Sequence, residues 1–307
     1  LVNGDTTAES NETFFVNITN VVGATVADAQ GQGTIVNDDF SISLISAVQG
    51  SGAVSPVVGQ TVAVEGIVVG AFQAANQLQG FFLQEEDAQS DGNSATSEGI
   101  FVFCGGCPTT VVQGQKVMVV GAVSEFNNMT QITASTAGSV SVTDAGNNLA
   151  LVTPATITLP IVCDIDTYYE AREGMLVTYG NTLTVTEHFE LARYGHIVLH
   201  EGGRPFQFTE TTAPSAAGYL AHQDAMARRR VILDDDTNAQ EAYLTQAEGN
   251  QAIYYPRANG GFSAGTQGLD FFRAGDTVTA LTGVLHWSFP GLGANTWRIR
   301  PSAAHPV

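Results

Sequence analysis

The chain has 307 residues, of which 44% are hydrophobic, and its 30 acidic and 11 basic side chains give a formal net charge of −19. This composition excludes a disordered chain, and the length suggests about two domains. No uncharged apolar run reaches the roughly 18 residues of a membrane-spanning helix, and the scarcity of bases disfavours a large nucleic-acid-binding face.

Short runs rich in Val, Ile, Thr and Phe alternate along the chain with Gly, Asn, Asp and Thr. This pattern is typical of an all-β chain built from many short strands. One stretch, residues 214–230, instead predicts a helix with Ser215 as its N-cap and arginines in its last turn. The expected strands cover Thr13–Thr19, Gly33–Val36, Thr61–Val69, Gly80–Gln84, Gly99–Phe103, Lys116–Val123, Met175–Val185, His196–Leu199, Thr277–Val284 and Thr296–Ile299.

Turn residues cluster near residues 37–40 and again near residues 154–160, which divides the chain into three pieces. The pieces cover residues 1–40, 41–158 and 159–307. The first piece holds only two or three strands and is too short to bury a core alone, since an isolated hairpin is marginally stable in water. It therefore needs strands from elsewhere.

The first piece contains the run AESNETFFVNITNVVGATVADAQGQGTIVNDD, which resembles the closing strands of a Calx-β domain. The resemblance implies an incomplete sandwich, either cut from a longer domain or completing a sheet of another molecule. It also implies a calcium site. The matching positions are Glu9, Glu12, Phe14, Val16, Gly23, Ala24, Asp28, Gly33, Ile35, Asp38 and Asp39, and the calcium ligands would be Glu9, Glu12, Asp28, Asp38 and Asp39.

The runs ISAVQGSGAVSPVVGQTVAVEGIVVGAF, LQGFFLQEEDAQSDGNSATSEGIFVF and GQKVMVVGAVSEFNNMTQIT are similar to the OB-like domain of large secreted bacterial nucleases. Residues from YYEAREGMLV to LTGVLHWSF resemble the β domain that follows it. Together the resemblances predict an all-β fold: an OB-like barrel and a second β domain with one helical insertion, preceded by the incomplete Calx-β sandwich fragment.

In that family a catalytic domain of the endonuclease/exonuclease/phosphatase class comes next. Its metal-binding motifs have no counterpart in this sequence, which also contains no G-x-S-x-G, H-E-x-x-H or P-loop motif. We therefore predict that the chain is not an enzyme.

An acidic stretch between two expected strands is the strongest candidate ligand site. Oxygen ligands on a flexible loop suit calcium, and Gly92 permits a tight turn. The spacing is not that of an EF-hand, and a solvated acidic loop is the alternative. The candidate calcium ligands are Glu85, Glu86, Asp87, Asp91, Asn93 and Glu98.

Cys104 and Cys107 follow an expected strand and precede a proline. No helix start is expected there to favour a redox pair, and no second cysteine pair completes a zinc site. A local disulfide is expected, which leaves Cys163 either buried or reactive. With a single lysine, Lys116, the composition suits a secreted, extracellular bacterial protein.

Most of the arginines lie in the last third of the chain. They are expected either to line an anion groove that includes Arg193, Arg228 and Arg298, or to pair internally with Asp234, Asp235 and Asp236. Three sequons mark acceptor sites for glycans, should the source attach them, at Asn11, Asn17 and Asn128.

Two functions remain. In the preferred one, the chain is a calcium-stabilised structural module whose residues 1–40 pair with an identical subunit and build a fibre. In the other, it is the accessory, nucleic-acid-binding region of a secreted nuclease.

Overall fold

The computed structural model describes residues 12–35, 41–238, 273–289 and 294–307. The chain divides into two compact units, Leu1–Ile42 and Ser43–Val307. The fold is mostly β, with a closed five-stranded barrel, a curled half-barrel sheet and few helices, as the sequence predicts.

The first unit contains a two-stranded antiparallel sheet, β1 (Glu12–Asn17) and β2 (Gln30–Ile35). Phe14 lies opposite Gly33, and a Cβ at Gly33 would come within 2.4 Å of the Phe14 ring. Glycine at this position therefore lets the ring lie flat across the neighbouring strand. Among the strands that the structure describes, β1 and β2 pair only with each other.

The second unit begins with α1 (Ile45–Gln49) and the barrel. The order β3-β4-β5-β7-β6 closes because β6 pairs back onto β3, and β5 runs parallel to β7. This closed barrel confirms the OB-like expectation. The barrel strands are β3 (Thr61–Phe72), β4 (Gly80–Gln84), β5 (Gly99–Phe103), β6 (Lys116–Phe126) and β7 (Met129–Thr133), and β8 (Val140–Asp144) pairs beside them with β6.

Eight further strands form the curled second sheet, in the order β14-β11-β12-β13-β16-β15-β10-β9. Residues 155–157, which the expected boundary at residue 158 assigns to the barrel piece, pair with this sheet. The strands are β9 (Ala155–Ile157), β10 (Leu176–Tyr179), β11 (Leu183–Glu187), β12 (Ile197–Glu201), β13 (Arg230–Leu233), β14 (Thr277–Val278), β15 (Thr282–Ser288) and β16 (Thr296–Arg300).

The longest helix, α5 (Ala216–Ala227), begins where the sequence places it, because the Ser215 side chain accepts a hydrogen bond from the backbone N–H of Gly218. The expectation that its arginines fill the last turn is wrong. Arg228 is the C-cap and Arg230 already belongs to β13. The shorter helices are α2 (Ile165–Glu170), α3 (Leu191–Tyr194) and α4 (Phe208–Thr211), and two 3₁₀ turns are η1 (Asp87–Gln89) and η2 (Leu149–Leu151).

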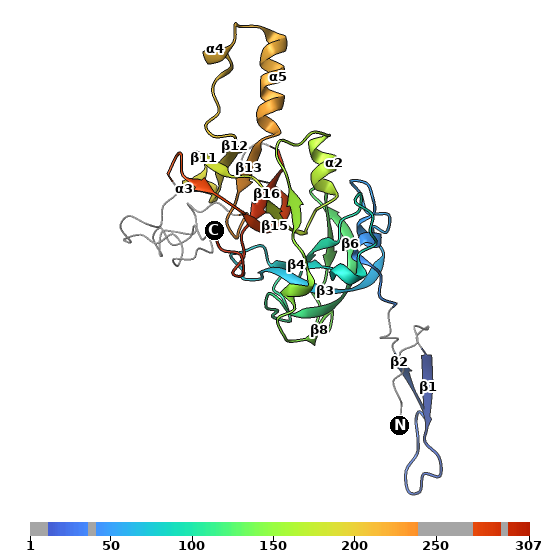
Figure 1. The fold of residues 1–307 in the computed structure, drawn as a ribbon. Helices are drawn as coiled ribbons and strands as arrows, with labels where there is room; N and C mark the ends of the chain where they lie inside the picture. The colour runs from blue at the N-terminus through green and yellow to red at the C-terminus, as the bar shows by residue number, and fades with distance from the viewer. Residues whose placement is uncertain (1–11, 36–40, 239–272, 290–293) are drawn as a thin grey trace. The chain divides into compact units, whose positions relative to one another are not determined.

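The barrel and the curled sheet pack directly against each other (Figure 1). Gly99 of β5 and Gly174 before β10 allow the closest approach, since a Cβ at Gly99 would lie 2.5 Å from the Gly174 backbone. The shared apolar cluster contains Ile67, Val69, Phe72, Phe82, Phe101, Met129, Val152, Leu176 and Val284. No helix among the described residues is long and apolar enough to cross a membrane.

Candidate functional site

The hairpin of the first unit has one apolar and one largely polar face. Side chains alternate along a strand, so positions 12, 14 and 16 share one face with Ile35 and with the two glycines opposite, and Phe14 and Val16 are the described side chains of β1 on that face. The other face carries Thr13, Phe15, Asn17, Gln30, Gln32 and Thr34. Within this unit the apolar face has no covering layer of described residues, and Phe14 and Val16 are 43% and 57% exposed.

The segment between β1 and β2 adds further exposed apolar side chains. Ile18 and Val22 are 54% and 95% exposed, and Val21 and Val26 are exposed as well. A sheet with one apolar face needs a second layer to bury that face. The first unit therefore presents apolar side chains that no described residue of the unit covers.

In the acidic loop, Glu85, Asp91 and Glu98 lie together. Glu85 is 3% exposed and accepts a hydrogen bond from the backbone N–H of Ile45. Oε2 of Glu85 and Oε2 of Glu98 are both buried. If both carboxyl groups are ionised, neither oxygen has a hydrogen-bond donor among the described residues. Burial raises the pKa of Glu85 to about 8, and the neighbouring Glu98 carboxylate adds to the shift. A proton held by Glu85 lets the two carboxyl groups share a hydrogen bond.

Glu98 also organises the loop around it. Its Oε1 accepts from the Ser90 hydroxyl at 2.8 Å and from the backbone N–H of Asp91 at 3.2 Å. Asp91 accepts from the backbone N–H of Asn93 at 2.7 Å and from the Thr96 hydroxyl at 2.9 Å. These hydrogen bonds lower the pKa of Asp91.

The other expected calcium ligands are engaged elsewhere. Glu86 forms an ion pair with Lys116 at 3.0 Å, and Asp87 accepts from the backbone and hydroxyl of Thr153. Asn93 caps a turn by accepting from the backbone N–H of Ala95. The six side chains do not converge on one point, and within the described residues no group of three or more acidic, histidine or cysteine side chains has the geometry of a metal site. Calcium binding by this loop stays a prediction.

The second expected calcium site lies largely outside the described residues. Glu9, Asp38 and Asp39 fall in the undescribed segments, as does the side chain of Glu12. Asp28 is described, and it accepts a hydrogen bond from the backbone N–H of Gln30 at 3.0 Å.

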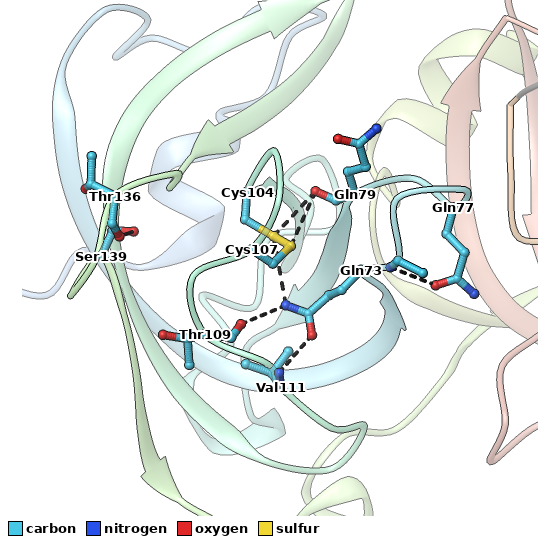
Figure 2. The surroundings of a disulfide bond; sticks show 10 residues. Gln73, Gln77, Gln79, Cys104, Cys107, Thr109, Val111, Thr136 and Ser139 are labelled. Carbon is cyan, nitrogen blue, oxygen red and sulfur yellow. Dashed lines mark hydrogen bonds between the residues drawn. A yellow bond between two sulfur atoms is a disulfide. The ribbon is translucent and has the colours of Figure 1, made fainter.

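The expected disulfide between Cys104 and Cys107 is present in the loop after β5 (Figure 2). The Gln79 carbonyl accepts from the backbone N–H of Cys104 at 3.0 Å. The Gln73 side chain donates to the Thr109 carbonyl at 2.9 Å and accepts from the backbone N–H of Val111 at 2.8 Å. The bridge is thus embedded in a network that fixes a loop. Cys163 is exposed.

The three arginines of the expected anion groove occupy separate environments. Arg298 is 2% exposed and is paired with Asp234, so its guanidinium is not open to a solvent ligand. Arg228 donates to Asp224 and to the carbonyls of Ile161 and Cys163. Arg193 lies over the Tyr194 ring, 4.9 Å from its centroid. Of the two expectations for the arginines, internal pairing with an aspartate is therefore the one that holds for Arg298.

Arg300 belongs to the same buried network, in agreement with the expected internal pairing of the late arginines with Asp234 and Asp235. It is 0% exposed, pairs with Asp234 at 2.9 Å and donates through Nε to His286 Nδ1 at 2.9 Å. It also donates to the carbonyls of Asp235 and Thr237. The network ties β16 to the segment after β13.

Sequence reasoning missed a group of buried carboxyl side chains on β6, on α2 and just after α2. Glu173 is 1% exposed, and burial raises its pKa well above the ordinary value, with a further contribution from Glu170. Burial likewise raises the pKa of Glu170 to about 7, and Glu125 adds to the shift. Glu173 and Glu125 both accept hydrogen bonds from Thr130, so the group links barrel and sheet.

An OB barrel usually binds its ligand on the face formed by its second and third strands and by the loops after its first and fourth strands. In this protein the curled sheet covers that face. Here Phe82 of β4 and Phe101 of β5 are buried against the ring of His286, with centroids 5.3 and 5.8 Å away. Gln77, after β3, donates to Asp236 at 2.7 Å, and Trp287 donates to the carbonyl of Asn127, after β6, at 3.0 Å.

Two of the three sequons fall on described residues. Asn17 and Asn128 are both exposed, whereas Asn11 lies outside the described residues. Comparison with known protein families and with curated proteins finds no match for this chain.

Proposed function

We propose that the chain is a non-catalytic, secreted structural module that assembles into a fibre, its amino-terminal hairpin packing onto a neighbouring subunit. The observation that carries this proposal is the uncovered apolar face of the hairpin, with Phe14 and Val16 about half exposed. Burying such a face is favourable by roughly 25 cal/mol per Å² of apolar surface. A partner layer would supply the second side of the sandwich.

An identical subunit can act as that partner. The hairpin and the surface that receives it are different parts of the chain, so the contact is head to tail and does not close on itself. Among the described strands of the barrel, β8 pairs along one side only, with β6. The Val140 carbonyl accepts a hydrogen bond from the Thr109 hydroxyl, but the rest of the sequence VSVTD contains no lysine or proline to block pairing, so the edge from Ser141 to Asp144 is a suitable acceptor for β1 or β2.

The alternative, an accessory nucleic-acid-binding region, draws support from the OB-like barrel. Two observations weaken it: the net charge of −19 repels phosphates, and the usual ligand face of the barrel is packed against the second sheet.

Sedimentation velocity of the full chain and of a chain lacking residues 1–42 tests the proposal. The full chain should form large, concentration-dependent species, and the shortened chain should remain a monomer. Repeating both runs with calcium and with a chelator tests the predicted stabilisation by calcium. A full chain that stays monomeric at every concentration would refute the fibre, and salt-sensitive binding of single-stranded DNA by that monomer would favour the accessory module.

A further inference from the structure

A cavity of about 670 Å³ lies between the helical pair α4–α5 and the outer face of strands β11, β12 and β13. Figure 1 shows α4 and α5 projecting together from the end of the sheet, where β12 ends and β13 begins. The volume falls in the range of small-molecule sites, about 300 to 1,000 Å³. The strands contribute Glu187, His200 and Arg230 to the lining, and the helical pair with the segment before it contributes Phe206, Phe208 and Tyr219.

The cavity exists because α5 does not pack onto the sheet. None of its twelve residues is buried. Phe208 of α4, 8% exposed, holds the pair of helices together, with its ring 6.2 Å from Tyr219 and 5.8 Å from His222. A Cβ at Gly218 would lie 2.6 Å from the Phe208 ring, so glycine there permits the close contact.

The sheet supplies a polar floor. Along β12, Ile197 and Leu199 point into the core of the curled sheet, whereas Val198 and His200 lie on the opposite face and line the cavity. Burial lowers the pKa of His200, so its ring is neutral at neutral pH, and both ring nitrogens are shielded from solvent, so the ring forms part of the wall without presenting a nitrogen to a ligand. Arg230 lies directly across from His200 on β13.

The mouth of the cavity carries aromatic rings. Phe206 and Tyr219 are 54% and 49% exposed. The Tyr219 hydroxyl accepts a hydrogen bond from the Gln223 side chain at 3.0 Å, which places a planar amide beside the ring. Glu187 and Arg230 are the one acidic and the one basic residue of the lining, so their charges cancel.

We propose that this cavity binds a neutral saccharide. Each sugar hydroxyl both donates and accepts a hydrogen bond, which suits a lining that mixes carboxylate, guanidinium and amide groups. The C–H faces of a sugar ring can stack on Phe206 and Tyr219. A phosphorylated ligand would meet the Glu187 carboxylate and a chain of net charge −19, and a purely apolar ligand would leave Glu187 and Arg230 without new partners. The site does not depend on assembly through the hairpin.

Titration of the full chain with maltose, lactose and N,N′-diacetylchitobiose, followed by saturation-transfer NMR, tests the inference. At least one of these sugars should bind, and Phe206→Ala or Arg230→Met should weaken binding at least tenfold. Phe126→Ala, which removes a phenylalanine that is 60% exposed on the barrel, is the matched control and should leave binding unchanged. Thermal unfolding of each variant checks that the fold is intact.

Three outcomes overturn the proposal. The first is no binding of any of the three sugars up to about 10 mM, where a site with a dissociation constant of 1 mM is close to saturation. The second is equal weakening by the Phe126 and Phe206 variants. The third is binding of adenosine monophosphate in preference to the sugars, which would assign the cavity to a nucleotide.

Discussion

The two faces of the amino-terminal hairpin offer a direct test of how the chain assembles. The paired substitutions Phe14→Ser and Val16→Ser remove the apolar face, and Phe15→Ser with Thr13→Ser change the opposite face of the same strand. Phe14 and Val16 are 43% and 57% exposed, and Phe15 is 52% exposed. The two variants thus remove exposed phenylalanines of similar accessibility from opposite sides.

Complete burial of a phenylalanine or valine side chain contributes about 1.5 to 3 kcal/mol. About half of each side chain on the apolar face is still exposed, so covering both should contribute about 2 kcal/mol. This corresponds to a roughly thirtyfold change in the association constant, since 1.4 kcal/mol is tenfold. Sedimentation equilibrium should show this loss for the Phe14 and Val16 variant alone. Equal losses for the two faces, or none for either, would refute docking through the apolar face.

Three further predictions concern the stability of the second unit. The raised pKa means that Glu85 binds a proton more tightly in the folded chain than in the unfolded chain. The stability that this proton contributes is fully present below the ordinary pKa of 4.5 and is lost as the pH rises through about 8. Glu85→Gln should therefore become more stable relative to the native chain across that window, by on the order of 5 kcal/mol. A difference in urea unfolding that does not vary with pH would contradict the shift. Arg300→Met should destabilise by about 3 to 5 kcal/mol because it leaves Asp234 and two carbonyls short of donors in the interior. Arg228→Met, at a solvent-exposed pair with Asp224, should cost much less because water screens that pair. Similar values for the two would show that burial of the network adds nothing. Gly99→Ala should lower the unfolding temperature by several degrees because its Cβ meets the Gly174 backbone, and an unchanged melting curve would mean that barrel and sheet separate at no cost.

The sequence predicted the strands well where alternation and turn residues agree. Gly80–Gln84 and Gly99–Phe103 are observed with the expected bounds. The expected strand Met175–Val185 is instead two strands separated at Gly180 and Asn181, because Asn181 exchanges side-chain hydrogen bonds with the backbone of Leu159. That partner lies far along the chain and has no local signal.

The acidic loop shows why the ligand site was harder to predict than the fold. Spacing alone suggested that six neighbouring oxygen donors would face one ion. In the structure Glu85 meets Ile45, Glu86 meets Lys116 and Asp87 meets Thr153, each on a distant segment. Tertiary contacts therefore divide a cluster that is continuous in sequence. Asp91 and Asn93 stay near Glu98, and the Glu85–Glu98 pair is compatible with a shared proton.

The packing of the barrel bears on the choice between a fibre-forming module and a nucleic-acid-binding region. In an isolated OB barrel, exposed aromatic side chains on the second and third strands stack on bases. Here the corresponding rings, Phe82 and Phe101, are 0% and 5% exposed, and the curled sheet covers them. A nucleic acid could reach them only if the two sheets came apart, which would expose the whole shared apolar cluster to water. The fold therefore uses the ligand face of its barrel as an internal joint. The surfaces proposed for recognition lie outside that joint: the hairpin with its apolar face, and the cavity beneath α5.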